Sequence, residues 1–470
     1  MKSKFYITIS FLCLILTSCD KILDVQPKHI RTESEVYSND RSVDSVVSGM
    51  YQVLSRSSYS LDIPLMTGLS SDELKPSSMS YGQSYIQMHN NQLDPTMSTT
   101  NSFWTDSYQV IYVANSILEG ISKYSGMSEA AKLQYSGEAK FVRAFCYFYL
   151  VNFFGDVPLV LETNYKVTGR LPRLAKEDVY EQIEKDLIDA ENGLMDGYPS
   201  SGRVRANRWV AKAFLARVHL YQGKWEEALR YANEVIGNEA RYKLGKLDTF
   251  DSEGALISMM DIFKADNEEA IWQFWNEYGS SLGGYTISPY YWTCAVADGF
   301  EAGLLEAFEA GDLRKKSYIQ VTEGSGSESK VNKYRLYDRD PDYEEYTMVL
   351  RLSEQYFIRA EALTRLDFVK EGLLDLNTIR DRAGLQPFSL ILDKESVLEK
   401  IEKERRVELC FEWGDRWLNL KRLGTLDAVM KKAKPTTWRS TAALYPIPFQ
   451  EFLSNRSLTQ NPGYSSQKIF

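Results

Sequence analysis

The chain contains one short sequence that could act as a nucleophilic site. Residues 279–283 read Gly-Ser-Ser-Leu-Gly and fit the G-x-S-x-G pattern, in which a serine at a sharp strand-to-helix turn attacks an acyl group. That turn must open a helix, but Gly284 and Pro289 follow it. The histidine of such a triad should come after the serine, whereas all the histidines precede it: His29, His89 and His219. We therefore expect a non-catalytic protein. A secreted serine hydrolase acting through Ser281 is the alternative from a different class.

A second pattern could in principle bind a metal ion. Acidic residues alternate along one short segment: Asp338, Asp340, Asp342 and Glu344. A calcium-binding EF-hand loop would require glycine at the position of Tyr343 and glutamate at the position of Val349. We therefore predict a solvated acidic turn, no metal site and no cofactor, with adventitious calcium binding as the alternative.

Aromatic side chains are densest between residues 272 and 292, on and after a predicted strand that covers 270–278. Trp272 and Phe274 share one face of that strand, and we expect them to pack in the interior. The other aromatic residues are separated by glycines and serines. In polar loops, Tyr and Trp present an apolar face beside a polar tip, which suits the apolar face of a pyranose ring. We predict that a carbohydrate contacts Trp275, Tyr278, Tyr285, Tyr290, Tyr291 and Trp292.

Residues 61–101 form a second region with an unusual composition. They include few helix formers and many Ser, Thr, Asn and Gly residues, so we expect a loop-rich insertion. Tyr81 and Tyr85 are candidate contacts for the same ligand. Sugar hydroxyls also need polar partners, and Asp72 is the candidate acceptor.

Most of the remaining chain shows the periodicity of amphipathic helices. In residues 206–237, Ala216 and Ala228 stand on either side of Trp225, the pattern of a tetratricopeptide hairpin, in which small residues let two helices approach closely. Similar hairpins are expected at 137–193 and 350–383. We predict a mainly α fold with a tetratricopeptide-like scaffold, a few short strands, and long insertions at about 61–101 and 238–349. The charged cluster at 404–408 should form ion pairs that brace helices.

The N-terminus has the features of an export and anchoring signal. Residues 1–18 combine two lysines with an apolar run shorter than the about 20 residues that span a bilayer, which predicts a cleaved signal peptide. Small residues precede Cys19, as at a lipoprotein cleavage site. Lipidation of Cys19 would anchor the chain to a membrane. Residues 19–30 are then a tether, and residues 31–470 are one domain.

Charge and cysteine content exclude other classes of protein. The chain has 55 basic and 64 acidic residues, and removal of the two lysines in 1–18 leaves a net charge of −11. An acidic chain with no basic stripe does not favour nucleic-acid binding. Beyond Cys19 the cysteines are odd in number and far apart, so we predict free thiols at Cys146, Cys294 and Cys410.

Several longer segments occur in a characteristic order. They are GEAKFVRAFCYFYLVNFFGDVPL (137–159), RLSEQYFIRAEALTRL (351–366), GLLDLNTIRDRAGL (372–385), IEKERRVELCFEWGDRWLNLKRLG (401–424), PIP (446–448) and LTQNPGY (458–464). In this order they resemble the SusD/RagB family over nearly the whole chain. Members of that family are surface lipoproteins of the outer membrane that collect nutrients for a TonB-dependent transporter.

The resemblance implies a cell-surface lipoprotein with a SusD-like fold. Such a protein captures an oligosaccharide and delivers it to a SusC-like transporter, with ligand-binding aromatics in both insertions near Ser71-Asp72-Glu73. A RagB-like peptide-binding lipoprotein is the alternative within the family. The match indicates the family and leaves the identity of the glycan open.

Overall fold

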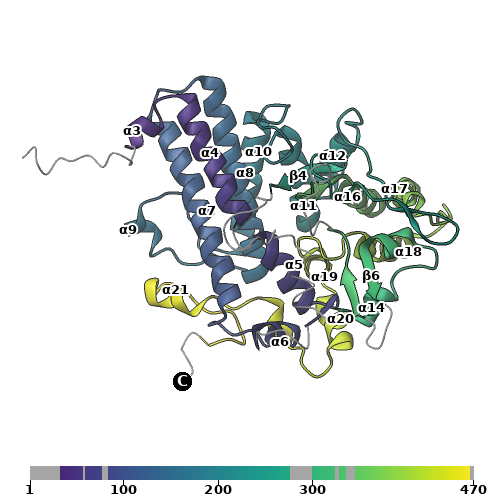
Figure 1. Cartoon of the computed structure of the whole chain (residues 1–470). Helices are drawn as coiled ribbons and strands as arrows, with labels where there is room; N and C mark the ends of the chain where they lie inside the picture. The colour runs from purple at the N-terminus through teal and green to yellow at the C-terminus, as the bar shows by residue number, and fades with distance from the viewer. Residues whose placement is uncertain are drawn as a thin grey trace, which may run out of the picture.

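A computed structural model shows a mainly helical molecule, as the sequence predicts (Figure 1). It describes residues 32–56, 59–76, 83–275, 299–322, 328–334 and 344–465. The described α-helices are α3 (Glu33–Val36), α4 (Asp40–Arg56), α5 (Tyr59–Ser70), α6 (Gln83–His89), α7 (Ser98–Lys123), α8 (Glu129–Phe154), α9 (Tyr165–Thr168), α10 (Lys176–Gly193), α11 (Arg208–Gln222), α12 (Trp225–Ile236), α14 (Ala302–Leu305), α15 (Leu313–Tyr318), α16 (Leu352–Arg365), α17 (Val369–Arg382), α18 (Lys394–Glu408), α19 (Asp415–Arg422), α20 (Leu426–Ala433) and α21 (Phe449–Ser454). A short 3-10 helix, η1, covers Ser440–Ala443. None of these described helices has the length and apolar composition that crossing a membrane requires.

Long helices α4, α7, α8 and α10 form one side of the molecule (Figure 1). Helix α8 packs against both α7 and α10 and is buried along most of its length. It begins after Ser128, whose hydroxyl accepts a hydrogen bond from the backbone N–H of Ala131, and it ends at Gly155, whose φ of 72° favours glycine. Phe145 of α8 packs edge-on against Trp272 with a centroid distance of 5.0 Å. The aromatic core is therefore built around α8.

Helical hairpins α11–α12 and α16–α17 form another part of the scaffold. Gly223, with a φ of 70°, makes the tight turn between α11 and α12. Ala216 and Ala228 are fully buried, as expected for small residues between closely packed helices. Helix α12 also packs against α16, so the two hairpins stack on each other. The predicted tetratricopeptide-like scaffold is confirmed.

The described strands form two-stranded antiparallel pairs. The strands are β1 (Leu74–Lys75), β2 (Thr249–Phe250), β3 (Leu256–Ser258), β4 (Ala270–Phe274), β5 (Gly299–Phe300), β6 (Ile319–Thr322), β7 (Glu328–Val331) and β8 (Thr347–Arg351), paired as β1–β5, β2–β3, β4–β8 and β6–β7. Strands β4 and β8 are buried at every position. Trp272 and Phe274 lie in the core, which confirms the packing role predicted for them.

Residues 61–70 are more helical than their composition indicates. They belong to α5, which contains Pro64 within the helix. Ile63, Met66 and Leu69 are buried, so tertiary packing stabilises the helix despite weak local propensity. Our expectation of a loop-rich stretch is wrong for this part of the insertion.

A buried set of charges, which we call the central ion-pair network, joins distant parts of the chain. Its members are Glu269, Arg314, Lys333, Arg351, Arg382, Glu404, Glu408 and Glu412. Arg351 donates hydrogen bonds to Glu269 (2.8 Å), Glu408 (2.6 Å) and Glu412 (2.7 Å). The network thus connects β8 with α18 and with the segment before β4. It confirms that the charged cluster at 404–408 braces the helices.

Candidate ligand-binding site

A cavity of about 720 Å³ lies where α4, the segment 199–205 and the ends of β4 and β8 meet. Its described lining is mostly small and polar, with aromatic side chains on one side. The lining residues are Asp44, Ser45, Ser48, Gly49, Tyr51, Gln52, Ser55, Pro199, Ser200, Ser201, Val204, Arg205, Phe274, Trp275 and Tyr346. Cavities of this size fall in the range of small-molecule binding sites.

Helix α4 contributes a small polar surface to the cavity. Its apolar positions, such as Val47 and Leu54, are fully buried in the core. Helical periodicity places Ser45, Ser48 and Gln52 on a different face, which borders the cavity. An added Cβ at position 49, between these residues, would meet no described atom within 4 Å beyond the helix's own backbone, so the surface is open there. A ligand can therefore approach the helix closely and find hydroxyl and amide partners.

Trp275 and Tyr346 form the aromatic side of the cavity. Trp275 follows β4 directly and Tyr346 precedes β8, and the pairing of Phe274 with Thr347 brings the two residues together. Trp275 is 41% exposed, whereas Tyr346 is half-buried. Burial and the nearby charge of Glu344 raise the pKa of Tyr346 to about 12, against the opposing hydrogen bond with Trp275. Tyr346 therefore stays a neutral phenol at physiological pH.

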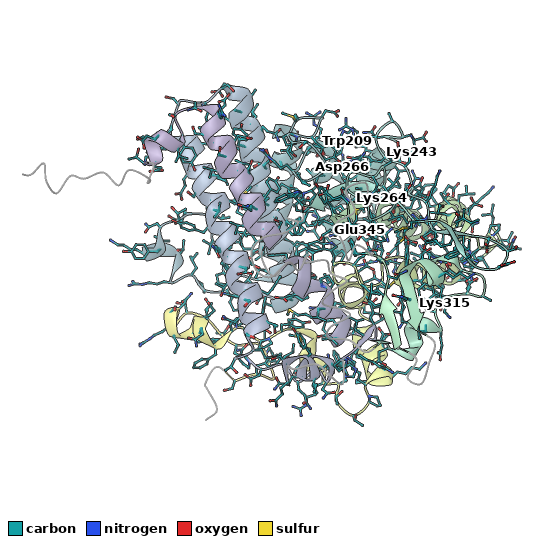
Figure 2. The ribbon with its side chains drawn as sticks, in the orientation of Figure 1. Trp209, Lys243, Lys264, Asp266, Lys315 and Glu345 are labelled. Carbon is teal, nitrogen blue, oxygen red and sulfur yellow. The ribbon has the colours of Figure 1, made fainter. Side chains whose placement is uncertain are left out.

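The segment that carries Tyr346 is fixed to the chain before β4. The backbone N–H of Ala265 donates to the carbonyl of Glu344 at 2.8 Å. Lys264 and Glu345 form an isolated antiparallel bridge, and both lie in one neighbourhood in Figure 2. The aromatic side of the cavity is therefore held by backbone pairing and does not depend on side-chain contacts alone.

Arg205 lies at the polar end of the cavity and is almost completely buried. Its Nε and Nη2 donate to the carboxylate of Glu138 at 2.9 and 2.8 Å, and its Nη1 donates to Asp44 at 2.8 Å and to Ser48 at 3.3 Å. Burial alone would lower the pKa of Arg205, but the hydrogen bonds and charges of Glu138 and Asp44 outweigh it and raise the pKa. Arg205 thus fixes α4, α8 and the segment 199–205 to one another.

Asp72 lies away from this cavity, in a second cluster of charges. Its carboxylate accepts hydrogen bonds from Arg416 at 2.8 and 2.9 Å and from Arg406 at 2.8 Å, and the residue is 7% exposed. Burial favours the neutral acid, but the two arginines outweigh burial and lower the pKa of Asp72. Both carboxylate oxygens are therefore engaged within the protein, and Asp72 braces the region before β1.

The pairing of β1 with β5 connects the two predicted ligand-binding insertions. Lys75 pairs with Gly299, and the backbone N–H of Glu301 donates to the carbonyl of Glu73 at 3.0 Å. The described chain therefore stops at Trp275, beside the cavity, and resumes at Gly299, beside β1. Glu73 lies directly before β1. Its burial, and to a smaller extent the charge of Asp72, raises the pKa of Glu73 to about 8.

The structure places only some of the residues predicted to contact a ligand. Trp275 lines the cavity, whereas Tyr85 of α6 is half-buried and packs against the core. Asp72 and Tyr85 do not belong to the described lining of the cavity. The other predicted positions lie outside the described residues: Cys19, Tyr81, Tyr278, Ser281, Tyr285, Tyr290, Tyr291, Trp292, Cys294, Asp338, Asp340 and Asp342. Cys146 and Cys410 are buried free thiols, as predicted.

Sequence reasoning missed the polar face of α4, together with Arg205 and Tyr346. The small or polar residues at 45, 48, 49 and 52 recur with helical spacing opposite the apolar positions, and this signal could have been found. The contribution of Arg205 and Tyr346 depends on contacts between segments far apart in the chain. Such contacts leave no local signal in the sequence.

Two family models match this chain. One, described as starch-binding and associating with the outer membrane, matches residues 21–220, and the other, the SusD family, matches residues 315–464. Among curated proteins, the chain is 25% identical to SusD-like protein P25 of Formosa agariphila, over 99% of this chain and all of that protein. It is 23% identical to the starch-binding protein SusD of Bacteroides thetaiotaomicron, over 73% of this chain and 75% of that one.

Solved structures show the same architecture. A laminarin-binding SusD-like protein superposes with a TM-score of 0.73 at 25% identity, over 91% of this chain and all of that chain. A SusD-like protein from Bacteroides fragilis superposes with a TM-score of 0.76 at 22% identity, over 92% of this chain and 99% of that chain. The helical scaffold described above is thus shared with proteins of low sequence identity.

Proposed function

The chain belongs to the SusD/RagB family, a family of carbohydrate-binding proteins, and from this membership we propose that the cavity beside Trp275 binds an oligosaccharide. The observation that carries the proposal is that the exposed indole of Trp275 lines the same cavity as the polar surface of α4. An aromatic face can stack on a sugar ring, while the serine hydroxyls and the Gln52 amide can bond its hydroxyl groups. The protein binds its ligand and does not turn it over.

Further contacts are proposed from the sequence. The aromatic residues after Trp275 would extend the stacking surface, and the second insertion would add contacts beyond the cavity. These residues are Tyr81, Tyr85, Tyr278, Tyr285, Tyr290, Tyr291 and Trp292. Asp72, the hydroxyl acceptor that the sequence suggests, is assigned to bracing instead, because Arg406 and Arg416 bond both of its carboxylate oxygens.

Replacing Trp275 with alanine tests the site. Stacking of nucleic-acid bases on aromatic side chains contributes about 1–3 kcal/mol per base, and sugar stacking of similar size would weaken binding by about tenfold or more. Calorimetric titration of the mature chain with a panel of neutral oligosaccharides would measure the change, and a peptide panel would detect a peptide-binding protein. Trp275→Phe should retain most of the affinity.

A matched control is Tyr165→Ala, which removes an exposed aromatic side chain on α9, far from β4 in Figure 1. This variant should bind like the parent. If Trp275→Ala is folded and retains the parental affinity for a glycan, the site lies elsewhere.

We also propose that the protein is anchored to the outer membrane through lipidated Cys19 and delivers its ligand to a SusC-like TonB-dependent transporter. The matched family description, which names association with the outer membrane, supports this assignment.

Extraction of native membranes with mild detergent should recover the parent together with a transporter barrel. Cys19→Ser should move the protein to the soluble fraction and remove acyl labelling without changing its melting temperature. Acyl labelling that persists in Cys19→Ser, or recovery of the parent alone in every detergent, would contradict the proposal.

A further inference from the structure

The charges around the described cavity are arranged so that no free cation faces a ligand. Arg205 is the basic side chain among the described lining residues, and it is 6% exposed. Two carboxylates, those of Glu138 and Asp44, bond its guanidinium at 2.8–2.9 Å. Glu138 is fully buried directly behind it. The positive charge of Arg205 is therefore already compensated within the protein.

The charge that a ligand does meet in the described cavity is negative. The side chain of Asp44 is 45% exposed, and only its Oδ1 accepts the bond from Arg205. The neighbouring partners on α4, Ser45, Ser48 and Gln52, are uncharged.

We propose that this cavity selects uncharged oligosaccharides and rejects glycans that carry carboxylate or sulfate groups. The inference rests on the proposed function and specifies the class of glycan. A sugar hydroxyl can donate to the carboxylate of Asp44, and such hydrogen bonds to a charged group are among the stronger ones. A uronate in the same place would bring a second negative charge to Asp44, and the described lining offers no uncompensated cation to pair it. An unpaired charge in a partly desolvated site is costly.

Asp44 is therefore the residue that sets this specificity. Asp44→Asn keeps the shape of the side chain and removes the exposed negative charge. Arg205 keeps its bidentate partner Glu138, so the variant retains the ion pair that fixes the segment 199–205 to α8. In Asp44→Asn, Glu138 is the remaining carboxylate partner that balances the positive charge of Arg205. The variant should therefore bind anionic sugars more tightly than the parent does.

The test compares neutral and anionic glycans of equal length on three forms of the mature chain. The probes are hexasaccharides of glucan, mannan and xylan on one side, and hexamers of galacturonate and mannuronate on the other, at low and at physiological salt. The parent should bind at least one neutral probe at least tenfold more tightly than any uronate, and the gap should narrow at higher salt because screening weakens the repulsion. Asp44→Asn should narrow the affinity gap between neutral and uronate probes severalfold. Glu226→Gln, which removes an exposed charge on α12, should leave it unchanged.

The outcomes separate this inference from the proposed function. A parent that binds uronates as tightly as neutral probes supports glycan binding and overturns the inference. An unchanged preference in Asp44→Asn overturns the role given to Asp44. A folded parent that binds no probe of either class overturns the proposed function, and the inference with it.

Discussion

Replacing Glu408 with alanine should lower the free energy of unfolding by about 3–5 kcal/mol, the range found when one partner of a buried ion pair is removed. Glu408 is fully buried and its carboxylate pairs with Arg314, Arg351 and Arg382. Tyr318 also donates to it at 3.2 Å. Its loss leaves these guanidinium groups in the interior with one fewer anion. Urea unfolding followed by circular dichroism would measure the effect.

The contribution of Glu408 to the free energy of unfolding depends on pH in a defined direction. Burial alone would raise the pKa of Glu408, but Arg382, Arg351, Arg314 and Lys333 outweigh it and hold the pKa well below its ordinary value of 4.5. A carboxyl group with a lowered folded-state pKa contributes stability above its unfolded-state pKa and loses it as the pH falls below that value. Glu408→Gln should therefore lose less stability on acidification below about pH 4.5 than the parent does.

The matched control for Glu408 is an exposed ion pair. Lys243 and Glu268 lie 3.0 Å apart, with both side chains more than half exposed. Exposed pairs contribute little, so Lys243→Ala should leave the unfolding midpoint unchanged. An unfolding midpoint of Glu408→Ala equal to that of the parent would show that the central ion-pair network is not needed for stability.

Asp72→Ala should cost about 3 kcal/mol of stability, because Arg406 and Arg416 are then left in a largely buried position without their shared anion. The cost stands at the lower end of the range for buried pairs, since Arg416 retains Glu402 at 3.1 Å. The lowered pKa of Asp72 also predicts that its contribution is present above about pH 3.8 and is lost on further acidification.

A double-mutant cycle separates the bracing role of Asp72 from direct ligand contact. If the pair is coupled, Asp72→Ala combined with Arg416→Met should cost less than the sum of the two single changes. Under conditions where Asp72→Ala remains folded, it should bind glycan like the parent. Weaker binding at unchanged stability would instead make Asp72 the ligand contact that the sequence suggests.

The local parts of the fold could be predicted from the sequence. Helical periodicity located the hairpins, and the small residues Ala216 and Ala228 indicated where helices approach closely. The strand that contains Trp272 and the packing role of that residue were also apparent, because an apolar residue on a short β-branched and aromatic strand favours burial. Trp275 was found because it lies in the densest aromatic stretch, on or beside polar loop positions; the structure ends the strand earlier than predicted, at Phe274.

Features that depend on distant segments could not be predicted. The helical state of α5 comes from burial of its apolar side chains against the rest of the protein, which overrides its weak propensity. Asp72 stands in a polar stretch that suggests exposure, yet Arg406 and Arg416 cover it. The compensation of Arg205 by Glu138 and Asp44 requires three separate segments to meet. The local sequence carries no information about contacts between segments that are far apart in the chain.

The bond between Asp72 and its arginines also sets an order of folding. The partners are 334 and 344 residues apart in the chain, so the contact closes a very long loop, whereas α11 and α12 are neighbours in sequence. Contacts between near residues form with less loss of chain entropy and therefore earlier. In pulse-labelling hydrogen exchange during refolding, amides of α8 and α11 should gain protection before those of residues 72–75. We therefore expect the region around residues 72–75 to be completed only after α18 and α19, which carry its arginine partners, have formed.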